Sequence, residues 1–277
     1  MTATRDLIVA ALAEDGAAND LTANAVVPAD ARALATITQK APGVIAGLDV
    51  ARETFGAVDE GLSVTVSTDE GVWRDAGPVL TIEGLARPIL AAERVALNFL
   101  GRLWGIATLT ARFVTAVEGT GAQILDTRKT APGLRELEKG AVVAGGGVSH
   151  RAGLHDAILV KENHAALAGG VGEAARRALA EAPEGVRVQV ECATLEDLDQ
   201  ALDAGVELVL LDNMGLDELR AAVERAAGRA VLEASGGITL ENVRAIAETG
   251  VERISIGALT HSAPALDLSL TLEPRPS

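Results

Sequence analysis

The sequence has almost no cysteine: Cys192 is the only one among 277 residues. A single thiol cannot close an intramolecular disulfide, and without a cysteine pair there is no pattern for a structural zinc site. This usage is typical of a reducing compartment, so we expect a cytoplasmic protein. Cys192 follows Glu191, whose negative charge would raise the thiol pKa, and we interpret the cysteine as a buried structural residue.

Long apolar runs and an excess of basic residues are also absent. No uncharged apolar run reaches the roughly 18 to 20 residues that a membrane span requires, and the N-terminal segment has no cleavage-type pattern. Lysine and arginine number 24 against 39 aspartates and glutamates, a net charge of −15. Such a molecule repels nucleic acid and anionic membranes, and we expect neither as a partner. Screening over about 8 Å still leaves local groups able to bind a small anion.

The first hundred residues predict a small α+β unit. Apolar periodicity at residues 4–14 and in LDVARETFGAV indicates two helices. Alternating Val, Ile and Thr in ARALATITQK, SVTVST and PVLTIEGLA predicts antiparallel strands. The segment GAANDLTANAVVP is rich in Asn, Asp and Gly and predicts a loop.

A long helical pattern begins at Pro88, a residue that is tolerated in the first turn of a helix. We interpret this helix as the connector between two domains and expect a bend at Gly105. Arg94 and Arg102 lie on it, and the simplest interpretation of either is a solvated helix arginine.

A different pattern starts after Gly121. Six short runs rich in Val, Ile and Leu are each bounded by turn residues, as strands buried on both faces would be: AQILDT, AILVK, VRVQVEC, ELVLLDN, AVLEASG and RISIG. Helical patterns separate the later runs: TLEDLDQALDAG, LDELRAAVERAAG and TLENVRAIAETG. A repeated strand–helix unit without hairpin turns predicts a parallel sheet, either doubly wound or closed into a barrel.

Polar residues or glycines stand at or just past the end of every one of these runs. They are Asp126 with Arg128 and Lys129, Lys161, Glu191, Asp212, Ser235 with Gly236 and Gly237, and Gly257 followed by His261. In a parallel barrel the carboxyl ends of the strands converge on one mouth, which is where barrel enzymes carry their active sites. We therefore predict an active site there, to which the basic segment 126–164 adds His150 and Arg151.

The predicted mouth combines two kinds of side chain. One kind donates hydrogen bonds to carboxylate or phosphate oxygens: Arg128, Lys129, His150, Arg151, Lys161 and His261. The other kind is Glu191 and Asp212, which we expect on opposite strands, where they could hold ribose hydroxyls or a divalent cation with its waters. SGG at 235–237, with a helix expected to start near Thr239, offers backbone N–H groups to a phosphate. The set predicts a phosphorylated sugar, a carboxylate and a metal.

Several blocks of the sequence together resemble the quinolinate phosphoribosyltransferase family: DTRKTAPGLRELEK, GGGVSHRAGLHDAILVKENH, VLLDNM, LEASGGITLENVRAIAETGV and SIGALTHS, with DLTANAVVP and AAERVALNFLGRLWGIAT nearer the N-terminus. The resemblance covers nearly the whole chain. It implies an N-terminal α/β sandwich domain over residues 1–107, to which the tail 265–277 is assigned, and an incomplete, seven-stranded parallel α/β barrel over 108–264. The sequence itself reveals only six barrel strands.

The resemblance also implies a reaction. The family joins quinolinate to 5-phosphoribosyl 1-diphosphate with Mg²⁺, giving nicotinate mononucleotide, diphosphate and CO₂ for NAD biosynthesis, and works as a homodimer with shared active sites. By the matching motifs, Arg94 would reach quinolinate in the partner's site. The quinolinate carboxylates and the diphosphate would be held by Arg128, Lys129, His150, Arg151 and Lys161. Glu191 and Asp212 would contact the ribose hydroxyls and the Mg²⁺, and the 5-phosphate would be surrounded by Ser235, Gly236, Gly257 and His261. The expected catalytic residues are Lys129, Lys161, Glu191 and Asp212.

Two other functions fit the same residues. A lysine at the end of a barrel strand, as Lys161 is, is also where Schiff-base lyases and aldolases carry their nucleophile. A non-enzymatic, anion-binding member of the fold would bind quinolinate without releasing CO₂. Departures from the family pattern occur at Gly140, Ser149 and His155, and they remove none of the proposed ligands.

Overall fold

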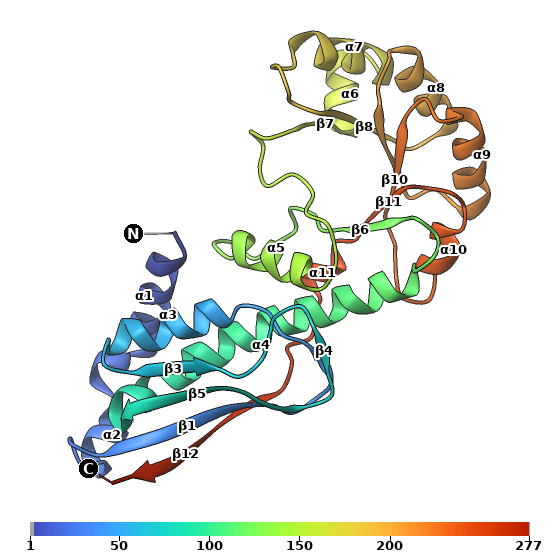
Figure 1. Ribbon diagram of the computed structural model, residues 1–277. Helices are drawn as coiled ribbons and strands as arrows, with labels where there is room; N and C mark the ends of the chain where they lie inside the picture. The colour runs from blue at the N-terminus through green and yellow to red at the C-terminus, as the bar shows by residue number, and fades with distance from the viewer. Residues whose placement is uncertain (1–2, 277) are drawn as a thin grey trace. The chain divides into compact units, whose positions relative to one another are not determined.

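The computed structural model describes residues 3–276, which form two compact units (Figure 1). Unit 1 comprises the described residues up to 109 together with 131–146 and those from 262 onward, and unit 2 comprises 110–130 and 147–261. The chain therefore passes between the units more than once. The segment 131–146, which the sequence assigned to the barrel domain, packs with unit 1.

A four-stranded antiparallel sheet is the basis of unit 1. Its strand order is β12 (Leu268–Arg275), β1 (Arg32–Gln39), β5 (Gly77–Leu85) and β3 (Ser63–Val66). The three strands predicted for this region are confirmed, whereas β12, which pairs with the whole length of β1, was not predicted. Alternate residues of β1 are fully buried, as a half-buried sheet requires. A separate pair is formed by β2 (Gly43–Val44) and β4 (Trp73–Arg74).

The helices of unit 1 confirm two predictions and correct one. The predicted helices at 4–14 and 48–58 are present as α1 (Ala3–Asp15) and α3 (Leu48–Val58). The loop predicted at residues 16–28 is wrong, because this segment contains η1 (Ala17–Asn19) and α2 (Leu21–Val26). The helix α2 forms because Asp20 caps it, its Oδ1 accepting the N–H groups of Thr22 and Ala23 at 2.9 Å each.

The long helix predicted from Pro88 is α4 (Ala86–Ala116), 31 residues that continue unbroken through Gly105. Gly105 is required for a close approach, because a Cβ there would overlap the carbonyl oxygen of Pro264. One turn earlier, Gly101 accepts a hydrogen bond from the Leu266 N–H at 3.0 Å. The two glycines thus allow the C-terminal segment to lie directly on the helix. Among the described residues no helix, α4 included, has the length and apolar character that crossing a membrane demands.

An ion pair inside unit 1 joins segments that are far apart in the sequence. Arg102 on α4 donates from Nε and Nη2 to Oε1 of Glu138, at 3.1 and 2.9 Å. Glu138 lies on α5 (Arg135–Ala144), is completely buried, and also accepts the Ala131 N–H. A third Arg102 hydrogen bond, from Nη1, reaches the carbonyl of Ala263. The interpretation of Arg102 as a solvated side chain is therefore wrong: it holds α5 and the C-terminal segment to α4.

Unit 2 contains a six-stranded sheet in which every pairing is parallel. The order is β6 (Gln123–Leu125), β11 (Arg253–Ser255), β10 (Val231–Ser235), β9 (Leu208–Asp212), β8 (Val188–Cys192) and β7 (Ile158–Val160). All six strands were predicted and are confirmed. No seventh strand belongs to this sheet among residues 3–276, although Leu125 of the edge strand β6 makes an isolated parallel bridge to Val148.

Helices connect these strands and follow the outer side of the curved sheet, as α7, α8 and α9 show in Figure 1. The helices are α6 (Glu162–Ala168), α7 (Val171–Glu181), α8 (Leu195–Asp203), α9 (Leu216–Ala226), α10 (Val243–Ala247) and α11 (Ala258–His261). The predicted helices after Thr194 and Gly215 are confirmed as α8 and α9. The helix expected near Thr239 is shorter than predicted, because α10 begins only at Val243.

The close approach at Gly105 gives a stability prediction. Gly105→Ala should lower the free energy of unfolding by about 1–3 kcal/mol, because the added methyl group must displace the backbone at Pro264. Gly140→Ala on α5 is the matched control, since nothing lies within 4 Å of a Cβ at that position. It should be neutral or stabilising by up to about 1 kcal/mol. Urea unfolding measures both, and equal effects of the two substitutions would contradict the packing described for α4.

Candidate active site

A cavity of about 730 Å³ lies at the carboxyl ends of the strands of unit 2. Every predicted site residue except Arg94 lines it: Arg128, Lys129, His150, Arg151, Lys161, Glu191, Asp212, Ser235, Gly236, Gly257 and His261. These residues lie together because a parallel sheet brings the carboxyl ends of its strands to one edge. Arg94 is an exposed residue of α4 in unit 1 and is not among the lining residues.

The inner part of the cavity is formed by residues that the sequence reading did not assign to the site. Each lies two positions before a strand-end residue: Leu159, Leu210, Glu233 and Ser255. Side chains two apart on a strand point to the same face, so this layer lies beneath the predicted one. The same rule, applied to each strand, would have found them from the sequence. Asn213 also lines the cavity, and no comparable signal distinguishes it.

Two arginines give the cavity a strong attraction for anions. Arg151 is only 8% exposed, and its Nη1 donates to the Ala157 carbonyl at 3.2 Å. Burial lowers the pKa of Arg151, and the like charge of Arg128 lowers it further, with Asp156 opposing both. Neither arginine forms an ion pair in the part of the chain that the structure describes. A bound anion would relieve the repulsion between the two guanidinium groups.

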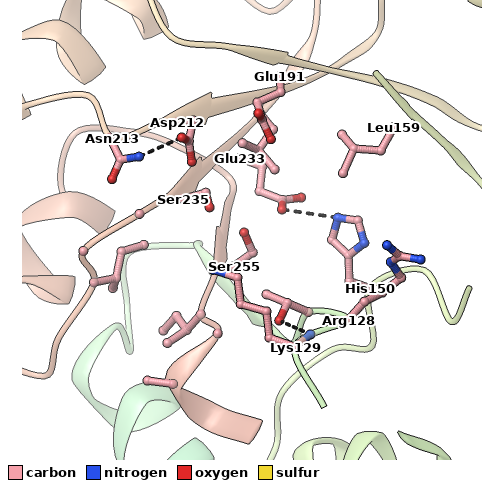
Figure 2. Close-up of a pocket in the computed structure, with 18 of the residues that line it drawn as sticks. Arg128, Lys129, His150, Leu159, Glu191, Asp212, Asn213, Glu233, Ser235 and Ser255 are labelled. Atoms are coloured by element: carbon pink, nitrogen blue, oxygen red, sulfur yellow. Dashed lines mark hydrogen bonds and ion pairs between the residues drawn. The ribbon is translucent and has the colours of Figure 1, made fainter. Parts of the chain in front are cut away.

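His150 is held from both sides of its ring. The ring Nε2 lies 3.0 Å from Gln189 Oε1 and 3.3 Å from Glu233 Oε1, while Nδ1 accepts the Arg151 N–H at 2.7 Å. Figure 2 shows the ring directed toward the Glu233 carboxylate. The sequence assigned His150 as a donor to the substrate, and that contact stays a prediction. In the structure both ring nitrogens have partners within the protein.

Glu233 is a fully buried carboxylate beneath the strand-end residues. The structure supplies two neighbours: Gln189 Nε2 donates to Oε2 at 3.0 Å, and His150 Nε2 lies 3.3 Å from Oε1. Burial, the largest influence, acts to raise the pKa of Glu233, but its interactions with His150, Ser255 and Gln189 together outweigh burial, and the pKa lies below its ordinary value. Glu233 is therefore ionised at neutral pH.

Lys161 and Glu191 form an ion pair across the neighbouring strands β7 and β8. Lys161 Nζ lies 2.6 Å from Glu191 Oε2, and the two side chains are 49% and 14% exposed. A lysine that forms a Schiff base must attack as a neutral amine, which pairing with a carboxylate disfavours. This geometry argues against the lyase alternative.

The two carboxylates proposed as metal ligands are neighbours. Glu191 lies one residue before the end of β8 and Asp212 ends β9; because these two strands are hydrogen-bonded to each other, the expectation of opposite strands is wrong. Asp212 accepts a 2.7 Å hydrogen bond from the Asn213 amide. No group of three or more metal-ligating side chains occurs within residues 3–276. Two adjacent carboxylates nevertheless fit Mg²⁺, which in such sites takes one or two carboxylates and completes its shell with water and substrate phosphate.

The glycine-rich turn after β10 lies at the cavity without the helix that was expected there. Because α10 begins at Val243, the backbone N–H groups available to a phosphate belong to the turn after Ser235 and not to a helix N-terminus. Gly236 has a φ of +97°, and a Cβ there would overlap the side chain of Asn213. Only glycine fits both constraints.

Comparison with known proteins gives consistent matches over nearly the whole chain. The family model described as "Quinolinate phosphoribosyl transferase, N-terminal domain" matches residues 20–104, and the corresponding C-terminal domain model matches residues 106–271. The nicotinate-nucleotide pyrophosphorylase [carboxylating] of Mycobacterium leprae is 46% identical, with 98% of this chain and 97% of that protein covered. A probable nicotinate-nucleotide pyrophosphorylase [carboxylating] of Bacillus subtilis is 40% identical over 93% of this chain and 89% of its own length.

Solved structures agree with the sequence matches. The nicotinate-nucleotide pyrophosphorylase from Francisella tularensis superposes with a TM-score of 0.93 at 38% identity, covering 98% of this chain and 96% of that one. NadC from Streptococcus pyogenes gives the same TM-score and coverage at 39% identity.

The environment of Cys192, the last residue of β8, gives a prediction about thiol reactivity. Burial, aided by the charges of Asp197 and Glu191, raises the pKa of the Cys192 thiol to about 12. Ellman's reagent at pH 8 should therefore not react with the folded protein over minutes, and should detect one thiol per chain after unfolding in urea. Rapid reaction in the folded state would show that the end of β8 is open to solvent.

Proposed function

The chain belongs to the quinolinate phosphoribosyltransferase family, and from that premise we propose how its cavity carries out the family's reaction. The protein transfers the phosphoribosyl group of 5-phosphoribosyl 1-diphosphate to quinolinate and releases CO₂, giving nicotinate mononucleotide and diphosphate for NAD biosynthesis. The observation that carries the site assignment is the pair Arg128 and Arg151, two neighbouring cations in the cavity of an acidic protein that form no ion pair within residues 3–276. Both substrates are polyanions, and quinolinate presents two neighbouring carboxylates that match a pair of guanidinium forks.

Binding the two anions in the right orientation supplies most of the catalysis in this proposal. The pyridine nitrogen of quinolinate attacks C1 of the ribose as diphosphate leaves, and the negative charge that grows on the diphosphate must be stabilised. At an effective dielectric constant near 20, two unit charges 4 Å apart interact by about 4 kcal/mol before desolvation is subtracted. Several such contacts from Arg128, Lys129, Arg151 and Lys161 can align two mutually repelling anions.

Further residues complete the proposed site. Glu191 and Asp212 hold the ribose hydroxyls and would carry Mg²⁺, which supplies charge compensation to the diphosphate when it is bound. The turn at Ser235 and Gly236, with Gly257 and His261, receives the 5-phosphate. Once the pyridinium nitrogen is positively charged, it stabilises the electron pair that stays on the adjacent carbon as CO₂ leaves, and that carbon then takes a proton from water. No side chain is required as a base in that step.

The assembly is proposed on the same basis. The protein acts in the cytoplasm as a homodimer in which Arg94 of one chain reaches quinolinate in the other chain's cavity, which accounts for its exposure on α4. The proposed domains are an N-terminal α/β sandwich over 1–107 with the C-terminal tail, and an incomplete barrel within 108–264 that excludes the segment 131–146, which belongs to unit 1. Val148 forms a parallel bridge with Leu125 at the free edge of β6, and we place the proposed seventh barrel strand there.

The proposed reaction is tested by incubating the protein with quinolinate, 5-phosphoribosyl 1-diphosphate and Mg²⁺ and following nicotinate mononucleotide. Lys161→Ala and Arg151→Ala should each lower kcat/KM at least about 100-fold, because each removes a charged contact to a substrate. Lys40→Ala, an exposed lysine of unit 1, is the matched control and should leave turnover unchanged. Thermal unfolding checks that all three fold, and near-normal rates in both cavity variants would refute the site.

The shared site is tested by mixing two inactive variants. Arg94→Ala lacks the residue donated across the dimer, and Lys161→Ala lacks one from the cavity itself. In a mixed dimer one site carries both defects and the other carries neither. Random subunit exchange should therefore restore about a quarter of the wild-type activity. Mixtures that stay inactive after refolding together would contradict a site built from two chains.

A further inference from the structure

Beneath the substrate-binding residues lies a buried polar layer to which the proposed chemistry assigns no role. Gln189 on β8, Glu233 on β10 and Ser255 on β11 are 3%, 0% and 4% exposed. Burying such groups is costly unless they are hydrogen-bonded, and a buried carboxylate is the most costly of the three. An aliphatic layer would stabilise the sheet more simply, as Leu159 and Leu210 do on the neighbouring strands.

The hydrogen bonds of this layer have a single consistent direction. Glu233 is ionised and can only accept, so the Gln189 group that lies 3.0 Å from it must be the amide nitrogen. This orientation turns Gln189 Oε1 toward His150 Nε2, which therefore carries a proton and donates. The other ring nitrogen, Nδ1, accepts the N–H of Arg151 at 2.7 Å. The proton positions of His150 thus follow from the charge on Glu233.

This chain of hydrogen bonds reaches the loop segment 149–151. Residues 149–151 belong to no helix or strand, yet they carry His150 and Arg151 into the cavity. Asp126, fully buried at the end of β6, accepts the His150 N–H at 2.8 Å from one side. The ring contacts to Gln189 and Glu233 hold the segment from the other side, and Figure 2 shows the Glu233 carboxylate directed at that ring.

We propose that Glu233 and Gln189 are positioning residues of this enzyme: their buried hydrogen-bond chain fixes the orientation and the protonated nitrogen of the His150 ring, and thereby the backbone that places Arg151 for an anionic substrate. The inference rests on the proposed function only in taking quinolinate as that anion. Glu233 touches no reacting atom in this account. It acts through Gln189 and His150.

Glu233→Gln tests the direction of the chain with almost no change of shape. An amide at position 233 would present a donor either to His150 or to the Gln189 amide nitrogen, so the sequence of donors and acceptors breaks in either orientation. We expect ¹⁵N NMR of histidine-labelled protein to show His150 as the Nε2–H form in the wild type and as a mixture of ring forms in the variant. The KM for quinolinate should rise about 10- to 100-fold, with a smaller change in kcat.

A double variant separates positioning from mere structural support. Gln189→Glu combined with Glu233→Gln exchanges the carboxylate and the amide. The carboxylate introduced at position 189 can accept from both His150 Nε2 and the new amide, so the direction of the chain is restored. We expect the Nε2–H form of His150 to return, and the KM for quinolinate to be lower in the double variant than in either single variant. Independent structural damage at the two positions would not produce such coupling. Glu224→Gln, an exposed glutamate on α9, is the control and should change nothing.

Three results would overturn the inference: an unchanged quinolinate KM in Glu233→Gln, an unchanged His150 spectrum, or losses in the double variant that simply add. If Glu233→Gln does not fold, Gln189→Met breaks the same chain while leaving the Glu233 carboxylate beside His150, and the same spectral change and weaker quinolinate binding are expected. Titration calorimetry with quinolinate keeps the two proposals distinguishable. A wild type that binds quinolinate but makes no nucleotide refutes the proposed function without touching the positioning role.

Discussion

The carboxylate of Glu233, buried completely inside a parallel sheet, is the constraint on which the site depends. A buried charge persists only when it is paired and hydrogen-bonded. Here the neighbouring groups come from two other segments: Gln189 on β8, and His150 between β6 and β7. Satisfying one carboxylate therefore fixes the irregular segment that carries Arg151, and couples the inner layer of the sheet to the cavity above it.

The parallel topology explains why an acidic protein can bind two anions. All six strands of the unit 2 sheet point the same way, so their carboxyl ends bring basic groups from distant parts of the sequence to one cavity. The net charge of −15 is spread over a surface whose field is screened within about 8 Å at physiological salt. Inside the cavity, the nearest charged side chains determine whether an anion is attracted. Arg128 and Arg151 lie close enough to repel each other.

The sequence predicts the features that short local patterns encode. It does not reveal the contacts between residues far apart in the chain, or the order of the strands in the sheet. Six apolar runs gave the six parallel strands, and their last residues gave the cavity lining. The helix α2 was missed because Asp20 in a polar stretch was taken for a turn residue, although it caps a helix. The partner of Arg102 lies on another helix, and Gln189 and Glu233 are 44 residues apart, so only the folded chain shows these contacts. Strand order is likewise not local, which is why Glu191 and Asp212 were expected on opposite strands.

In the proposed reaction, one cavity in unit 2 holds both anions on its arginines. A crystal structure with quinolinate and an unreactive analogue of 5-phosphoribosyl 1-diphosphate tests it most directly. The account predicts quinolinate carboxylates within hydrogen-bonding distance of Arg128 and Arg151, the analogue's 5-phosphate at the turn after Ser235, and a His150 ring still bonded to Gln189. Quinolinate bound outside this cavity, or bound in it without contact to either arginine, would contradict the account.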